Sequence, residues 1–188
     1  MKHIATVALM FNFGVAGIYA QPGPVNMTLS GTAAASTINL RPGTTTSEYQ
    51  LAGKGTLGQF DLRTVSISTP SAQQSKTCSG PTKLYLSAVA GAGVFRFENG
   101  DLLKVYLTGG GDCIDFSVGE ALCTRIFQVL GGTGRYTKAT GTLTLTMTVI
   151  PVLADGGPTN PVFFAVTGDV TGNLSGVTTD QGSQGGQP

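Results

Sequence analysis

Short runs in which apolar and polar residues alternate dominate the chain after residue 24. The clearest run covers residues 142–149, whose apolar members are Leu143, Leu145, Met147 and Val149 and whose intervening positions are all threonine. Successive side chains of a β-strand point to opposite faces, so a period of two indicates a strand. β-Branched threonine suits the pleated surface of a sheet. We therefore expect a strand here with one apolar and one hydroxyl-bearing face.

Similar but weaker alternation recurs along the whole chain. It marks residues 25–30, 49–56, 60–68, 83–89, 94–98, 102–108, 122–130, 161–167 and 170–174. The alternation slips by one residue between Leu62 and Val65, which predicts a β-bulge. Residues 30–47 are rich in small residues and predict a long loop. Eight to ten short strands joined by glycine-rich turns predict an all-β protein, either an antiparallel barrel or a sandwich.

The Asn-Gly pair at 99–100 is the strongest turn signal. It favours a two-residue hairpin turn, which sets Glu98 opposite Asp101 and Arg96 opposite Leu103. In that register Arg96 and Glu98 lie two residues apart on one strand face. If the face lines a barrel interior, the two charges mark a ligand pocket. If the face is turned to solvent, they form an ordinary surface pair.

Five side chains are candidates for ligand binding because each is polar and falls within or beside a predicted strand. They are Arg96, Glu98, Tyr85, Tyr106 and Arg125. A small number of polar groups that orient a ligand is typical of a mostly apolar binding pocket.

The glycine-rich segment 131–141 does not carry a phosphate-binding motif. It lacks the Gly-Lys-Ser/Thr of a Walker loop, and a strand rather than a helix follows it. We expect a tight connection between two strands. Its residues, Gly131-Gly132-Thr133-Gly134-Arg135-Tyr136 followed by Ala139-Thr140-Gly141, resemble a segment of the allene oxide cyclase and dirigent barrel superfamily.

The same segment, with residues 95–100 and 113–123, is also similar to small exported bacterial proteins of unknown role. The resemblance covers residues 80–177. It implies an antiparallel barrel of about eight strands, of the allene oxide cyclase-like or calycin-like type, with a small apolar cavity. It implies no catalytic residue in this chain.

The N-terminus has the pattern of a secretory signal. Met1-Lys2-His3 precedes an apolar stretch at 4–18, and Ala20 stands before a polar, proline-containing break. We expect cleavage after Ala20 and a secreted or periplasmic protein; an uncleaved membrane anchor is the alternative. The mature chain would then comprise one barrel domain at 21–177 and a disordered tail at 178–188, with no membrane-spanning segment. An outer-membrane barrel has strands of about 9–11 residues with aromatic girdles, and the short runs argue against it.

Loss of residues 1–20 changes the available chemistry. It removes His3, which is the only histidine, and Lys2, which leaves ten basic and ten acidic residues. Serine or cysteine catalysis with a histidine base and histidine-ligated metal sites are then excluded. We expect no cofactor and no metal. A chain without excess positive charge is not expected to bind nucleic acid.

Three cysteines remain after cleavage, so one disulfide and one leftover thiol are expected in an oxidising compartment. We predict a bond between Cys113 and Cys123, which bracket a loop-like segment. Cys78 could instead pair with either of them.

Two hypotheses for function follow. The first is an exported non-catalytic barrel that binds a small apolar ligand or serves as a surface or matrix component. The alternative is a cyclase- or dirigent-type enzyme, which would steer a reactive intermediate in an apolar barrel cavity without histidine.

Overall fold

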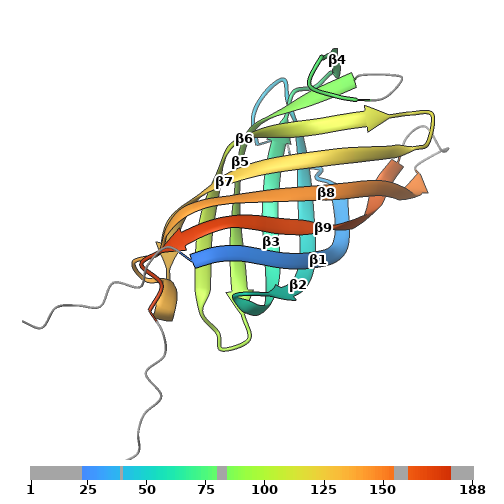
Figure 1. The fold of residues 1–188 in the computed structure, drawn as a ribbon. Helices are drawn as coiled ribbons and strands as arrows, with labels where there is room; N and C mark the ends of the chain where they lie inside the picture. Colours follow the sequence, from blue (N-terminus) through green and yellow to red (C-terminus); the bar gives the residue numbers. More distant parts are fainter. Residues whose placement is uncertain (1–22, 39, 80–83, 155–160, 179–188) are drawn as a thin grey trace, which may run out of the picture.

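Eight strands pair antiparallel in a ring, and the all-β barrel expected from the alternation is confirmed (Figure 1). The computed structural model describes residues 23–38, 40–79, 84–154 and 161–178. The ring strands are β1 (Gly23–Ala35), β2 (Thr45–Gly55), β3 (Gly58–Ser68), β5 (Leu84–Phe97), β6 (Leu102–Asp115), β7 (Glu120–Gly132), β8 (Thr140–Ala154) and β9 (Pro161–Ser175). The first and last strands of the chain, β1 and β9, are neighbours in the sheet, and the pairing of β3 with β5 closes the ring. A short strand, β4 (Gln73–Gln74), pairs with β5 outside the ring, and one 3-10 turn, η1 (Gly134–Tyr136), joins β7 to β8.

The strands are longer than predicted, at 11 to 15 residues each. Glycines at inward positions hide the strand pattern, because they interrupt the apolar alternation without ending the strand. At Gly31 an added Cβ would lie 2.2 Å from the backbone oxygen of Gln50, so only glycine allows β2 to approach this closely. The predicted loop at 30–47 is therefore shorter, because β1 continues to Ala35.

Strand β8 confirms the clearest prediction. Leu143, Leu145 and Met147 are at most 1% exposed and point into the barrel, while the threonines between them lie on the outer face. Four aromatic rings fill one end of the interior, which we call the aromatic end: Phe60, Phe95, Phe97 and Tyr136. The centroids of the contacting ring pairs lie 4.6 to 6.4 Å apart. Burial of each ring stabilises the fold by about 2–3 kcal/mol.

The predicted register of the β5–β6 hairpin is wrong by one residue. Gly100 has a φ of +85° and its amide donates to the Phe97 carbonyl, so the loop has three residues rather than two. Arg96 consequently lies opposite Leu102. A shift of one residue moves every side chain to the other face.

The corrected register places the aromatic and the charged residues at the end of β5 on opposite faces of the sheet. Phe95 and Phe97 point inward and are at most 3% exposed, whereas Arg96 and Glu98 are exposed on the outer face. The interior location considered for Arg96 and Glu98 is therefore wrong, because apolar rings occupy the inward positions.

The glycine-rich segment closes the aromatic end of the barrel, as the predicted tight connection. Arg135 lies over the rings of Phe97 and Tyr136, with its guanidinium carbon 5.3 and 4.8 Å from their centroids. The Arg135 amide donates to the Asp101 carboxylate, and its guanidinium donates to the Leu57 carbonyl. One residue thus ties together the β2–β3 turn, the β5–β6 turn and η1.

The predicted bulge between Leu62 and Val65 is also wrong. The inward alternation of β3 continues through Phe60, Leu62, Thr64 and Ser66, and the register shift occurs at residues 67–68. Two of these inward residues, Thr64 and Ser66, are polar and buried.

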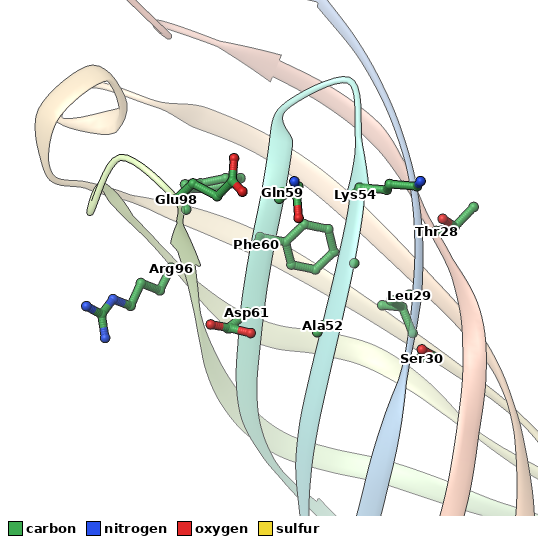
Figure 2. A pocket seen from close by; sticks show the side chains of 12 residues that line it. Thr28, Leu29, Ser30, Ala52, Lys54, Gln59, Phe60, Asp61, Arg96 and Glu98 are labelled. Atoms are coloured by element: carbon green, nitrogen blue, oxygen red, sulfur yellow. The ribbon is translucent and has the colours of Figure 1, made fainter.

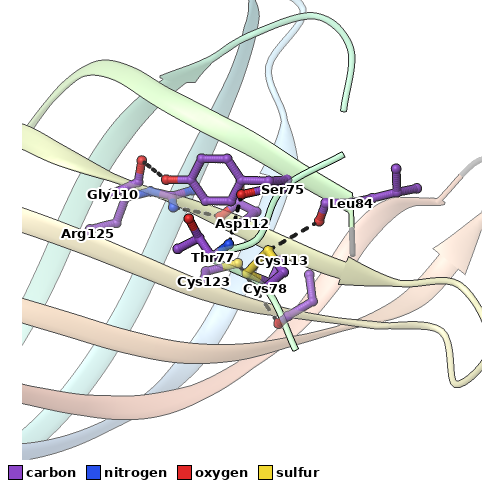
Figure 3. Close-up of a disulfide and its surroundings, with 11 residues drawn as sticks. Ser75, Thr77, Cys78, Leu84, Gly110, Asp112, Cys113, Cys123 and Arg125 are labelled. Carbon is purple, nitrogen blue, oxygen red and sulfur yellow. Dashed lines mark hydrogen bonds and ion pairs between the residues drawn. A yellow bond between two sulfur atoms is a disulfide. The ribbon is translucent and has the colours of Figure 1, made fainter. Parts of the chain in front are cut away.

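The disulfide joins Cys78 to Cys113, with Cα atoms 5.4 Å apart, and Cys123 is free and buried (Figure 3). The predicted Cys113–Cys123 bond is wrong because the two side chains lie on opposite faces of the sheet. Cys113 pairs in register with Leu122, whereas Cys123 pairs with Asp112. Cys113 therefore faces the outer segment that contains Cys78, which was the open alternative.

The predicted signal peptide (1–20) lies outside the described residues, as does almost all of the predicted tail (178–188). Within the part of the chain that the structure describes, no helix is long and apolar enough to cross a membrane.

The disulfide gives the first test. Loss of Cys78–Cys113, by Cys78→Ser or by reduction, should lower the free energy of unfolding by roughly 3–4 kcal/mol, because the bond closes a 35-residue span. Urea unfolding measures the loss. Alkylation of the unfolded, unreduced protein should modify Cys123 alone. Labelling of Cys78 or Cys113 before reduction would contradict the assignment.

Candidate functional site

A groove on the outside of the barrel brings together two of the candidate ligand-binding residues. It encloses about 830 Å³ over the outer faces of β1, β2, β3 and β5 (Figure 2). We call it the outer groove. Its polar lining is Thr28, Ser30, Lys54, Gln59, Asp61, Arg96 and Glu98.

Local sequence explains why these polar groups point outward. In each of the four strands they alternate with buried apolar residues, such as Leu29 in β1 and Phe60 in β3. Between them, the outward side chain of Ala52 is short and leaves the floor of the groove low, while Gly53 lines the groove with its backbone because its inward side has no room for a Cβ. An added Cβ at Gly53 would lie 2.7 Å from the ring of Phe60. The groove therefore has an apolar, close-packed floor and a charged margin.

Two cations and two anions surround this floor: Lys54, Arg96, Asp61 and Glu98. Asp61 lies opposite Arg96 in the β3–β5 ladder. Among the residues that the structure describes, however, no ion pair joins any two of the four. Figure 2 shows Lys54 and Arg96 at opposite sides of the groove, with Asp61 between them. The four charged groups are thus free to meet a ligand.

A second polar site lies inside the barrel. The guanidinium of Arg125, on β7, is 2% exposed and lies 2.6 Å from Asp112 Oδ1 in an ion pair. Arg125 Nε donates to Ser66 Oγ on β3 at 3.1 Å, and Nη2 donates to Tyr49 Oη on β2 at 3.3 Å. Because β2 and β7 stand on opposite sides of the ring, this side chain spans the barrel interior. We call Tyr49, Ser66, Asp112, Cys123 and Arg125 the interior polar cluster.

Burial governs the electrostatics of the interior polar cluster. It raises the pKa of Tyr49 well above its ordinary value of 10.0 and the pKa of the Cys123 thiol well above 9.0. Burial alone would lower the pKa of Arg125, but interactions with Tyr49 and Asp112 outweigh it and the pKa is raised. The cluster therefore holds one fixed cation, one carboxylate, a neutral phenol and a neutral thiol.

The interior polar cluster explains one of the two polar inward residues of β3. Ser66 faces the interior and accepts a hydrogen bond from the buried guanidinium of Arg125. Thr64 also faces inward, and its hydroxyl donates to the Ala92 carbonyl on β5. Sequence reasoning missed Tyr49 and Ser66. The signal was present as polar residues at the inward positions of β3, but it was interpreted as a bulge.

Two other candidate residues lie apart from both sites. Tyr85 is on the outer face of β5, where its hydroxyl donates to the Gly110 carbonyl at 2.9 Å and its ring covers Gly111. Tyr106 is 40% exposed on β6. The structure thus groups Arg96 with Glu98, adds Lys54 and Asp61, and places Arg125 in the interior.

Within the described residues, no three His, Cys, Asp or Glu side chains are arranged to hold a metal ion.

Comparison with known proteins gives little further information. No family model and no curated protein sequence matches the chain. Among solved structures, the chain is similar to a pterocarpan synthase dirigent protein at 12% identity, over 89% of this chain and 98% of that one, with a TM-score of 0.40. A likeness of this degree carries no argument about activity, so function must be inferred from the sites themselves.

The ion pair in the interior polar cluster can be tested by substitution. Arg125→Met leaves the Asp112 carboxylate without its partner and should lower the free energy of unfolding by about 3–5 kcal/mol. Arg125→Met with Asp112→Asn should recover part of this loss. The matched control is Arg96→Met, an exposed arginine whose replacement should change stability by less than about 0.5 kcal/mol. If urea unfolding showed the same loss of stability for Arg125→Met and Arg96→Met, the interior ion pair would not contribute to the stability of the fold.

The buried thiol predicts a pH dependence. Because the folded pKa of Cys123 is raised, the unfolded chain loses this proton first, so the contribution of this thiol to stability should be fully present well below pH 9 and be lost as the pH rises above it. The slope approaches about 1.4 kcal/mol per pH unit. Unfolding of the wild type and of Cys123→Ala, compared between about pH 7 and 10 without reductant, measures it. An identical pH profile for the two proteins would contradict the assignment.

Proposed function

We propose that this protein is an exported, non-catalytic binding barrel whose ligand lies in the outer groove. One observation carries the proposal. Two cationic and two anionic side chains surround an apolar floor in a groove of about 830 Å³, and no ion pair among the described residues joins them to one another. Convergent polar groups around an apolar floor are typical of a ligand site.

The expected ligand is small, with an apolar body and at least one charged or strongly polar group. Its body would rest on Ala52 and Gly53, and its polar group would meet Lys54 or Arg96. The interior is a poorer candidate for such a ligand, because aromatic rings in mutual contact occupy the aromatic end. The cyclase- or dirigent-type alternative needs an apolar cavity there and is therefore less well supported.

Export is supported by two independent features. The signal-like pattern at residues 1–20 is one. The Cys78–Cys113 disulfide is the other, since disulfides persist in oxidising compartments.

The groove can be tested with 8-anilinonaphthalene-1-sulfonate, a probe with an apolar body and one anionic group. Amide chemical-shift changes should map to the outer faces of β1, β2, β3 and β5. Substitution of both cations, Lys54→Gln with Arg96→Gln, should weaken binding by about five- to tenfold. Lys104→Gln, an exposed cation on β6 outside the groove, is the control.

Shift changes confined to interior residues, or equal affinity in the double variant and the control, would refute the groove as the site. Native mass spectrometry of protein purified from its own host's medium would then identify the natural ligand by mass.

A further inference from the structure

The charged side chains on the outside of the barrel are unevenly distributed. On the outer faces of β2, β3, β5 and β6 stand Glu48, Lys54, Asp61, Arg63, Arg96, Lys104 and Asp115. On the described outward positions of β7, β8, β9 and β1, the charged side chains are Asp169 and, at the first residue of β7, Glu120; the others are threonines, further uncharged residues and exposed apolar side chains such as Leu122, Leu130 and Ile150. We call the outer faces of β7, β8, β9 and β1 the hydroxyl wall; these strands lie side by side across Figure 1.

Threonines stand in register across the hydroxyl wall. Thr148 lies opposite Thr167, and Thr144 opposite Thr171, on β8 and β9. A further row crosses all four strands through Thr124, Thr146, Asp169 and Thr28. Neighbours within a row are about 4.8 Å apart and successive outward positions on a strand about 6.7 Å apart, so the hydroxyls form a regular array.

Strand propensity alone does not explain this composition. The strands β2, β3, β5 and β6 belong to the same barrel and also have exposed outward positions, yet their outer faces carry seven charged side chains. A typical protein surface mixes both signs of charge throughout. The near-absence of charge on one wall therefore distinguishes it from an ordinary solvated face.

The hydroxyl wall is hollowed around Asp169. A depression of about 400 Å³ is lined by Thr28, Thr146, Thr148, Thr167, Asp169 and Leu122. Asp169 has Thr146 as its direct neighbour on β8 and Thr28 on β1. A carboxylate that only accepts hydrogen bonds is thus surrounded by hydroxyls that both donate and accept.

We propose that the hydroxyl wall binds a neutral polysaccharide chain, which lies across the strands through the depression over Asp169. Sugar hydroxyls donate to the carboxylate and exchange hydrogen bonds with the threonines. A wall with almost no charge offers nothing to a polyanion or polycation, so the matching ligand is uncharged. β-Branched threonine loses little side-chain freedom on binding, which makes the array preorganised. This site is distinct from the outer groove, and the inference does not require a ligand in that groove.

The test uses the full-length secreted protein and a panel of insoluble polysaccharides: microcrystalline cellulose and chitin as neutral polymers, and polygalacturonate as an anionic one. We expect retention on a neutral polymer but not on polygalacturonate. Retention should persist in about 1 M NaCl, because no charge pairing is involved. Thr146→Val with Thr167→Val removes two hydroxyls at nearly constant shape and should weaken binding at least about tenfold.

Two further variants separate the hydroxyl wall from the rest of the surface. Asp169→Asn should weaken binding about threefold or more, whereas Thr108→Val, on the outer face of β6, should leave it unchanged. The groove variant Lys54→Gln with Arg96→Gln should also retain polysaccharide binding, so that failure of one proposal is distinguishable from failure of the other. Unchanged thermal unfolding confirms that each variant is folded.

The proposal is overturned if neither neutral polymer retains the protein, or if the threonine double variant binds as tightly as the Thr108→Val control. It is also overturned if the double variant instead abolishes a concentration-dependent dimer in sedimentation analysis, since the occupant of the wall would then be a second copy of the chain.

Discussion

Closure of the sheet depends on the antiparallel pairing of β3 with β5, in which Phe60 lies opposite Phe97 and Leu62 opposite Phe95. This ladder joins the two parts of the chain that flank β4, and it leaves the ring without unpaired edges. The same ladder directs aromatic side chains inward and Asp61 and Arg96 outward. The β3–β5 ladder therefore supplies core residues on its inner face and groove residues on its outer face. A slip of one residue in its register would exchange these two sets of side chains.

The interior is divided along the barrel. At the aromatic end, Arg135 covers the rings of Phe97 and Tyr136 and links three turns. Further along, Arg125 spans the interior and is held by Asp112, Ser66 and Tyr49. A buried guanidinium is costly to desolvate and is retained only with several partners. The barrel therefore uses hydrophobic packing at one end and directional polar contacts toward the other.

Regular patterns in the sequence predicted the fold well where side chains alternate without exception, as in residues 142–149. Prediction failed where a distant contact decides the local outcome. Asn99-Gly100 suits both two- and three-residue loops, and only the burial of Phe95 and Phe97 selects between them. Likewise, Ser66 is inward as a hydrogen-bond partner of Arg125, which lies 59 residues away in the sequence. Of the four charged residues of the outer groove, the sequence analysis identified Arg96 and Glu98. Lys54 and Asp61 were missed because they lie on strands whose proximity to β5 is evident only from the pairing of the strands in the ring.

The partnership of the first and last strands has a consequence for how the chain acquires its structure. Val25 pairs with Gly172, so the ladder between β1 and β9 joins residues almost as far apart as the described sequence allows. Contacts of such long sequence separation form slowly, since the entropy of closing the loop is paid before they stabilise anything. Until β9 is available, β1 has a partner on one side only, and the chain remains an open, incomplete sheet. In a polypeptide with this strand order, the barrel is complete only once the final strand has paired with the first.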